Sequence, residues 1–547
     1  MVDNDPNVIY GGDFEEKLQF ASLGELLIQH FTDGGEKPAL INGATGETWS
    51  FREILTPSSK LARVLYGAGI RQNDVVSILA ENRFEFTAIS YGTILLNAIL
   101  APVNTTYTER ELKHSLDISR PKFMFVSKVC ENKISLLKKL SYIKRIILLD
   151  NNDTDENTKI IPYKKFINKF ETTSFDVEKY ASQKVNLSEQ VALIFMSSGT
   201  TGLPKGCLLT HLNIFTCVAI NLERVPLGKE LFGNVVSLSI APWFHSMGFM
   251  AILLSATTRE FSMVYLDKFE PELYLQCIEK YKVVTIQVAP PLVVFLAKTP
   301  LLNKYDLSSL KVIFSGAAPL TQETEDQVKE RFNNEIIVLQ GYGQTEATLG
   351  VLYGSVSAGK PGSVGELAKG VYAKIVDEKG KSLGPNKVGE LCVKGPLVMK
   401  GYLNNNAATK ETIDKNSWLH TGDLGYYDED FQFFIVDRLK ELIKYKAFQV
   451  PPAELEALLL KNPKIKDVGV IGIPDEVAGE LPFAFVVKQP GVELTEEEVK
   501  DFVVKNASDA KWLRGGVKFI DEIPKNPSGK ILRRDLRDLY KNTKSKL

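Results

Sequence analysis

The clearest structural signal in this chain is the apolar run Val191–Met196 followed directly by Ser197-Ser198-Gly199-Thr200-Thr201-Gly202-Leu203-Pro204-Lys205-Gly206. The apolar run predicts a buried strand. The glycines after it let backbone N–H groups close around a phosphate, the hydroxyls add donors, and Lys205 adds a positive charge. Pro204 stands where a Walker A loop needs glycine, so we predict a phosphate-binding loop of a different kind. A solvated connector is the alternative, and the glycines and hydroxyls after a buried strand disfavour it.

Apolar strand-like runs alternate with helical patterns on both sides of this loop. Such alternation requires crossover connections, which predict mainly parallel sheets covered by helices on both faces. Capping-box spacing marks helix starts at Ser22/Glu25, Thr108/Glu111 and Thr495/Glu498. The predicted strand–helix pairs are Val75–Ala80 with Arg83–Leu100, Lys122–Ser127 with Glu131–Leu140, Val283–Ala289 with Pro291–Lys298, and Leu310–Ser315 with Thr321–Phe332, and Lys144–Leu149 is a further strand.

The pattern changes after Gly384, where short strands follow one another without long helices between them. From Asp437-Arg438-Leu439-Lys440 onward, helices and strands mix in a segment of about 110 residues, which is an ordinary domain size. We therefore predict an α/β fold with a large N-terminal domain at residues 1–437 and a small, mobile α+β domain at residues 438–547. The strands expected here are Gly389–Lys394, Phe433–Asp437, Glu441–Val450, Val468–Ile473, Pro482–Lys488 and Val517–Ile523, and the helices are Ala453–Leu460, Thr495–Lys505 and Ile531–Tyr540.

The composition of the 547-residue chain excludes several classes of partner. Its 66 Lys and Arg residues balance 67 Asp and Glu residues, so no global basic field attracts nucleic acid or an anionic membrane. No apolar run reaches the roughly 18 residues of a membrane span. The five cysteines are scattered without paired spacing, which argues against a disulfide scaffold or a zinc module.

Further motifs follow the glycine-rich loop in the order Tyr342-Gly343-Gln344-Thr345-Glu346, Thr421-Gly422-Asp423, Asp437-Arg438-Leu439-Lys440 and Asn526-Pro527-Ser528-Gly529-Lys530. Together they resemble the signatures of the adenylate-forming superfamily, which includes acyl-CoA synthetases, coumarate-CoA ligases, beetle luciferases and peptide-synthetase adenylation domains. The pattern is most similar to insect luciferase-like fatty acyl-CoA synthetases. The resemblance implies two steps: a carboxylic acid attacks ATP to give acyl-AMP, and CoA then takes the acyl group.

This chemistry depends on cations and oriented donors, because an anion must approach a polyanion. The resemblance implies that the phosphates contact Ser197, Ser198, Gly199, Thr200, Thr201, Gly202, Lys205 and the Thr345 hydroxyl. It also implies that Glu346 holds Mg²⁺, which typically binds through one carboxylate and substrate phosphates. On local sequence alone, Glu346 could equally be an exposed loop acid.

The nucleoside part of ATP is expected in two further segments. The resemblance implies an adenine pocket formed by Gly316, Ala317, Ala318 and Tyr342. It places the ribose on Asp423, whose two carboxylate oxygens can accept both hydroxyls, and on Arg438. Without the resemblance, Thr421-Gly422-Asp423 is an ordinary tight turn and Arg438 a structural salt-bridge partner.

Two lysines of the small domain are expected to serve different half-reactions. By resemblance, Lys530 bridges the substrate carboxylate and the phosphates during adenylation, although locally Ser528 could simply cap the helix that follows. Lys446 resembles the lysine of the thioester-forming step; the family commonly has glycine after it, where this chain has Ala447. We expect the small domain to rotate with Lys440 as hinge and to present each lysine in turn.

The acyl pocket is expected at Pro242-Trp243-Phe244-His245-Ser246-Met247-Gly248-Phe249, which follows a strand and begins an apolar helix. His245 matches a family position that faces the acyl carboxylate, and a structural histidine beside aromatic rings is the alternative. The wall residues favour a medium- or long-chain fatty acid, because each buried CH₂ adds about 0.8 kcal/mol. The other expected wall residues are Met247, Phe249, Gly341, Thr348, Leu349 and Val351.

Other functions stay open. A luciferase-type monooxygenase that oxidises an adenylated luciferin is disfavoured by two departures from beetle luciferases. Leu349 replaces their usual hydroxyl residue, and Phe215-Thr216-Cys217-Val218-Ala219 lacks their arginine. A non-catalytic binding protein is disfavoured because the motif residues are all present. Transfer to a carrier-protein arm is conceivable, but we expect none because the sequence shows no appended carrier domain.

The last three residues, Ser545-Lys546-Leu547, match a peroxisomal import signal. We therefore expect the protein to bind the peroxisomal import receptor through this tripeptide and to reside in the peroxisomal matrix. Its expected small-molecule partners are ATP, Mg²⁺, CoA and a fatty acid.

Overall fold

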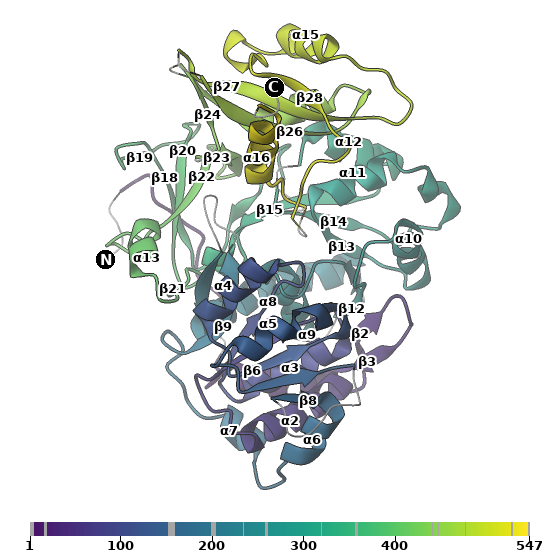
Figure 1. Ribbon diagram of the computed structural model, residues 1–547, viewed down its shortest axis with the longest axis vertical. Coiled ribbons are helices and arrows are strands. Elements are labelled where there is room, and N and C mark those ends of the chain that lie inside the picture. The colour runs from purple at the N-terminus through teal and green to yellow at the C-terminus, as the bar shows by residue number, and fades with distance from the viewer. Residues whose placement is uncertain are drawn as a thin grey trace.

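The computed structural model describes residues 5–15, 19–150, 159–197, 204–232, 235–257, 261–318, 320–355, 359–439, 441–446, 448–475, 477–526 and 529–544. In these ranges the strands form two large, mainly parallel sheets, a smaller antiparallel sheet and a C-terminal sheet (Figure 1). The predicted α/β class with a large N-terminal part and a small C-terminal part is therefore confirmed.

The two large sheets follow from the strand–helix alternation. The first has the order β21 (Gly401–Tyr402), β10 (Lys205–Thr210), β9 (Val191–Ser197), β5 (Ile99–Pro102), β4 (Val75–Leu79), β6 (Phe123–Val126), β7 (Arg145–Leu148) and β8 (Ile160–Pro162). The second has the order β17 (Glu366–Leu367), β16 (Gly350–Tyr353), β15 (Ile337–Gly343), β14 (Val312–Ser315), β13 (Thr285–Val288), β11 (Val235–Ser239), β12 (Phe261–Tyr265), β2 (Pro38–Asn42) and β3 (Thr48–Ser50). The strands from β9 to β8 and from β15 to β2 are parallel, so both sheets need crossover helices.

The other two sheets are built mainly from adjacent antiparallel strands. The third sheet contains β1 (Ile9–Tyr10), β18 (Tyr372–Val376), β20 (Gly389–Lys394), β22 (Leu419–Tyr427) and β23 (Phe433–Arg438), and β19 (Ser382–Leu383) pairs with β18. The C-terminal sheet contains β25 (Phe448–Val450), β24 (Ile443–Tyr445), β27 (Gly479–Lys488) and β26 (Ile465–Asp475), and β28 (Gly516–Phe519) runs parallel to β27. Figure 1 shows the C-terminal sheet at one end of the molecule.

Helices cover the sheets and fill the space between the two large ones. The helix α3 (Phe84–Leu95) contacts β4 and β5, and its Tyr91 Oη donates to Ile252 O of α9 (Ser246–Thr257), which contacts β12. All residues of α3 except Glu85 are buried, because the helix lies in this core. The remaining helices are α1 (Leu23–Gly34), α2 (Phe51–Gly67), α4 (Glu109–Ser119), α5 (Ile134–Lys139), α6 (Tyr163–Phe170), α7 (Val177–Ala181), α8 (His211–Phe232), α10 (Pro271–Lys280), α11 (Pro290–Lys298), α12 (Gln322–Arg331), α13 (Asn406–Thr412), α14 (Pro452–Leu460), α15 (Glu496–Asn506) and α16 (Arg533–Lys544).

Several predicted boundaries differ from the structure, and three of these differences have a clear local reason. The helix predicted at Arg83–Leu100 ends at Leu95, because Asn97 has a φ of 51° and the chain then enters β5. The single strand predicted at Glu441–Val450 is a hairpin of β24 and β25 that turns at Lys446, which has a φ of 51°. The last helix begins at Arg533 instead of Ile531, because Ile531 forms a β-bridge with Lys525.

The sequence predicts no membrane-spanning segment. None of the helices in the described ranges combines the length and the apolar character that crossing a bilayer requires.

Candidate active site

A cavity of about 990 Å³ collects most of the predicted site residues. Parallel strands contribute their carboxyl ends to its wall: Ser197 ends β9, Gly316 follows β14, and Tyr342 lies near the end of β15. Ligands of open α/β sheets bind at this edge of the sheet. Residues of the segment before and within α16 also line the cavity, so it joins the two large sheets to the C-terminal part.

Tyr342, Asp423 and Arg438 form a connected group on the cavity wall. Tyr342 Oη donates to Asp423 Oδ2 at 2.6 Å, and Arg438 Nε lies 3.2 Å from Asp423 Oδ1. Asp423 and Arg438 face each other as cross-strand partners in β22 and β23. Burial raises the pKa of Asp423, and Arg438 and the Tyr342 hydroxyl oppose that rise. Carboxylate oxygens have further lone pairs, so Asp423 can accept ribose hydroxyls while Arg438 keeps its salt bridge.

Glu346 is buried, which excludes its interpretation as an exposed loop acid. Ser197 Oγ donates to Glu346 Oε1 at 2.6 Å, and Tyr402 Oη donates to the same oxygen at 2.8 Å. Lys205 Nζ lies 4.6 Å from the centre of the Tyr402 ring. A carboxylate oxygen beside Ser197, the last described residue before the predicted phosphate-binding loop, fits Mg²⁺, so the structure is compatible with the predicted metal role of Glu346.

The two described ends of the glycine-rich segment lie on the paired strands β9 and β10. Ser197 and Lys205 are cross-strand partners at its two ends, and both line the cavity. The predicted phosphate contacts Ser198, Gly199, Thr200, Thr201 and Gly202 lie outside the described residues. The same holds for the predicted hinge Lys440 and for Ser545-Lys546-Leu547.

His245 and Thr345 both lie near the start of α9. Ser246 Oγ lies 3.1 Å from Thr345 Oγ1, and both residues line the cavity with His245. His245 Nδ1 accepts a hydrogen bond from the Met247 N–H at 3.4 Å. Burial, and then the positive charge of Lys530, lower the pKa of His245, so its imidazole is neutral at pH 7. A neutral histidine beside a lysine ammonium can orient a substrate carboxylate without adding charge.

Lys530 lines the cavity from the turn that precedes α16. Its N–H donates to Asn526 Oδ1 at 2.8 Å, and the Asn526 N–H donates to Lys530 O at 2.9 Å. The buried Arg533 anchors this segment through ion pairs of 2.7 Å to Glu441 and to Glu456. These contacts therefore fix the turn that carries Lys530 in the cavity wall.

The pKa of the Lys530 ammonium is lower than that of an ordinary lysine. Burial, together with the nearby positive charge of Arg438, lowers the pKa of Lys530 to about 8, while Glu441 and Asp423 act in the opposite direction. A lysine that contacts anions must be protonated, so its charge is present below this pKa and is lost as the pH rises through it.

We expect kcat/KM for acid-dependent adenylation to fall about tenfold per pH unit above a pKa near 8, because the free enzyme then loses the Lys530 charge. Initial rates between pH 6 and pH 10 measure this limb. Lys530→Arg keeps a positive charge at all these pH values, so its alkaline limb should move upward. An identical limb in wild type and Lys530→Arg would assign it to another group.

Lys446 stands apart from the cavity. It is exposed on the turn between β24 and β25, and its Nζ lies 5.3 Å from the centre of the Tyr445 ring. It does not line the cavity that Lys530 lines. The structure thus brings one of the two predicted lysines to the site and leaves the other outside.

The predicted acyl wall is partly corrected. Met247, Gly341 and Leu349 line the cavity, as expected. Phe249 does not, because it is buried against Phe195 at 5.5 Å between ring centres. Thr348 and Val351 also lie away from the cavity lining: the Thr348 hydroxyl donates to Leu397 O, and Val351 is buried. In the predicted adenine turn, Gly316 and Ala317 line the cavity but Ala318 does not.

Several cavity residues were missed from the sequence. Tyr402 holds Glu346 but belongs to no recognisable motif, because an isolated tyrosine carries no local signal. Glu390 accepts from the Gly422 N–H at 3.0 Å and supports the turn of Asp423. His420 directly precedes Thr421-Gly422-Asp423, and this adjacency was the available clue.

Comparisons with known proteins agree with this geometry. The family model described as AMP-binding enzyme matches residues 29–403, and the model of the AMP-binding enzyme C-terminal domain matches residues 454–530. The chain is 42% identical to a luciferin 4-monooxygenase of Photuris pensylvanica, across 99% of this chain and 100% of that protein. It is 39% identical to 4-coumarate:CoA ligase 1 of Petunia hybrida, across 94% and 93%. The crystal structure of ATP-bound MatB from Rhodopseudomonas palustris has a TM-score of 0.83 at 26% identity, across 95% of this chain and 99% of that one.

Proposed function

Since this chain belongs to the AMP-binding enzyme family, and is therefore an adenylate-forming enzyme, we propose that it is an acyl-CoA ligase for fatty acids with a medium or long chain. One observation carries the proposal. A single cavity joins the Lys530 ammonium, the Asp423 carboxylate and the Glu346 carboxylate to an apolar wall. These groups suit the activation of an oily acid by ATP.

In the first step, a carboxylate oxygen of the acid attacks the α-phosphorus of ATP. The bond from that phosphorus to the bridging oxygen breaks, and acyl-AMP and pyrophosphate form. Lys530 and Lys205 offset the negative charge that accumulates, and Asp423 holds the ribose. Mg²⁺ held by Glu346 would supply further charge neutralisation at the phosphates.

In the second step, the CoA thiolate attacks the acyl carbonyl, and AMP leaves. The proposed role of Lys446 in this step requires it to reach the cavity, which rotation of the C-terminal part would allow. Sequence similarity to 4-coumarate:CoA ligases supports CoA as the acyl acceptor. We also retain the peroxisomal matrix and the import receptor as proposals from Ser545-Lys546-Leu547.

The apolar part of the cavity supports the proposal that the substrate is a fatty acid. Among the described lining residues between positions 220 and 317, none is Asp, Glu, Lys or Arg. A second carboxylate or an amino group on the substrate would therefore find no opposite charge there. Apolar side chains from α8, α9, β12 and β14 contribute to this wall, namely Ile220, Met247, Ala251, Leu254, Phe261, Met263 and Phe314.

Acid-dependent exchange of pyrophosphate into ATP tests the proposal, because it measures acyl-AMP formation. We expect kcat/KM to rise about fourfold for each CH₂ added to a saturated acid, from about 0.8 kcal/mol per buried CH₂, until the pocket is full. Acetate and 4-coumarate serve as comparison acids. Preference for 4-coumarate would overturn the fatty-acid assignment, and no exchange with any acid would overturn the enzyme assignment.

A light-emitting oxidation of luciferin is the second candidate, favoured by the 42% identity to a luciferin 4-monooxygenase. Leu349 opposes it, because this apolar side chain lines the cavity. The segment around Cys217 bears less on the question, since Phe215, Cys217 and Val218 are buried in the core. Light output with luciferin, ATP and Mg²⁺ in air decides between the two functions.

A further inference from the structure

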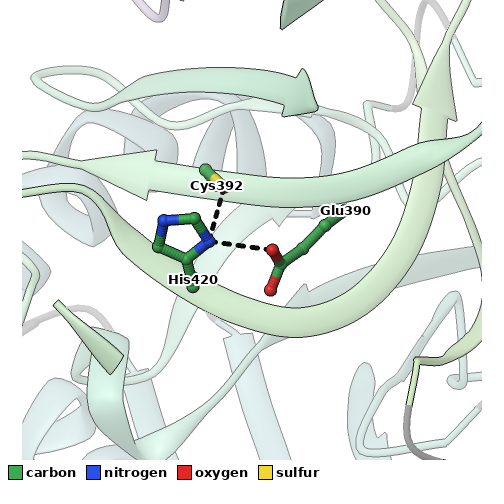
Figure 2. Close-up of side chains that lie close together, drawn as sticks. All are labelled: Glu390, Cys392 and His420. Carbon is green, nitrogen blue, oxygen red and sulfur yellow. Dashed lines mark hydrogen bonds and ion pairs between the residues drawn. The ribbon is translucent and has the colours of Figure 1, made fainter. Parts of the chain in front are cut away.

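Three side chains of types that can bind a metal ion lie close together, namely Glu390, Cys392 and His420 (Figure 2). Glu390 and Cys392 are two residues apart on β20, so their side chains emerge on the same face of the sheet. His420 lies opposite Cys392 on the neighbouring strand β22. Glu390 pairs with Leu424, so the register of the two strands shifts between Glu390 and Cys392. The extra residues of β22 at this shift belong to the segment Thr421-Gly422-Asp423. The local sheet geometry therefore brings a carboxylate, a thiol and an imidazole together.

The distances within this triad fit a shared ligand. The three ligand atoms all lie within 4.8 Å of one another. Cys392 Sγ lies 3.5 Å and Glu390 Oε2 lies 2.8 Å from the same atom, His420 Nδ1. Tetrahedral zinc, with bonds of about 2.3 Å to sulfur and 2.0 Å to nitrogen, separates those two donors by roughly 3.5 Å. The sulfur and the nitrogen are thus already spaced for zinc, and the carboxylate needs only a small movement.

The surroundings provide access and orientation. Glu390 and His420 line the cavity, while Cys392 is buried beneath them, so an ion could enter from the cavity side. The other ring nitrogen, His420 Nε2, lies 3.9 Å from Asp414 Oδ2, on the side where a carboxylate often orients a zinc-bound histidine. Three protein ligands leave the fourth position of a tetrahedron open for water or another ligand.

We propose that Glu390, Cys392 and His420 form a binding site for one divalent transition-metal ion of the zinc type. A thiolate and an imidazole select such an ion over Mg²⁺, which prefers oxygen ligands. Binding releases the thiol proton and any imidazole proton to solvent, because the ion takes their place. This site is separate from Glu346 and does not depend on the proposed ligase activity.

Metal binding to the full-length, EDTA-treated protein tests the site without ATP or acid. We expect calorimetry to show one Zn²⁺ bound per chain, and Co²⁺ to produce a thiolate-to-cobalt absorption band. Cys392→Ser should abolish the band and weaken Zn²⁺ binding by about tenfold or more. Cys130→Ser is the matched control, because Cys130 is equally buried but lies in another part of the fold. It should keep both the band and the affinity.

Two outcomes would overturn the site. If the wild-type protein gives no cobalt band, the three side chains form only a hydrogen-bonded group. If wild type and Cys392→Ser bind Zn²⁺ equally well, the ion binds elsewhere. If circular dichroism shows that Cys392→Ser is misfolded, His420→Gln replaces it with the same expected loss. Because pyrophosphate exchange is measured separately, failure of the metal site and failure of the ligase proposal are distinguishable.

Discussion

Lys530→Ala is expected to slow acyl-AMP formation by about 100- to 1,000-fold, the usual effect of removing one preorganised electrostatic contact from a transition state. Lys530 lines the same cavity as His245 and as Asp423, which is expected to bind the ribose. Its ammonium can therefore contact both the acid and the phosphates. Alanine removes this charge where two anions must approach each other. Pyrophosphate exchange into ATP measures the loss.

The same variant should retain transfer to CoA from supplied acyl-AMP, because that step begins after adenylation is complete. Lys525→Ala is the matched control: Lys525 lies on the same segment, but its Nζ is already paired with Asp467 at 2.6 Å. It should keep most of the exchange rate. Equal losses in Lys525→Ala and Lys530→Ala would indicate general damage to the segment.

Lys446→Ala is expected to show the opposite pattern, with thioester formation from acyl-AMP and CoA reduced by about 100-fold and adenylation preserved. In the structure Lys446 is exposed on the β24–β25 turn and outside the cavity, so adenylation does not use it. Its effect on the second step requires the C-terminal part to turn. Single-turnover assays of each half-reaction measure the two effects separately.

Lys444→Ala is the control for this variant, since Lys444 is exposed on the same hairpin. It should leave both half-reactions within about threefold of wild type, as is usual for surface substitutions. If Lys446→Ala slows both half-reactions equally, the two lysines do not divide the work.

The parallel sheets could be predicted because their signals are local and repeated. The run Val75–Ala80 became β4 with a difference of one residue, and both Thr108 and Thr495 form the capping boxes that their spacing predicts. The β24–β25 hairpin could not be predicted. Its apolar alternation continues through the reversal, and Lys446 occupies a left-handed position usually taken by glycine or asparagine.

The site residues also divide into those that the sequence predicts and those that it does not. Asp423 and Glu346 belong to contiguous motifs, so their neighbours in the sequence identify them. Tyr402 and Glu390 reach the cavity only through strand pairing, which the linear sequence does not display. The cysteines illustrate this most clearly: their spacing argued against a zinc module, yet pairing of β20 with β22 places Cys392 beside His420.

The position of Arg438 in β23 bears on how the two steps are linked. Although the predicted boundary assigns Arg438 to the small domain, it is the last residue of a strand in the third sheet and pairs there with Asp423. A pivot at Lys440 would therefore leave the Asp423–Arg438 pair in place while Lys530 departs. The adenylate would stay tethered by its sugar during the turnover, so the reactive anhydride need not escape into water between the two steps.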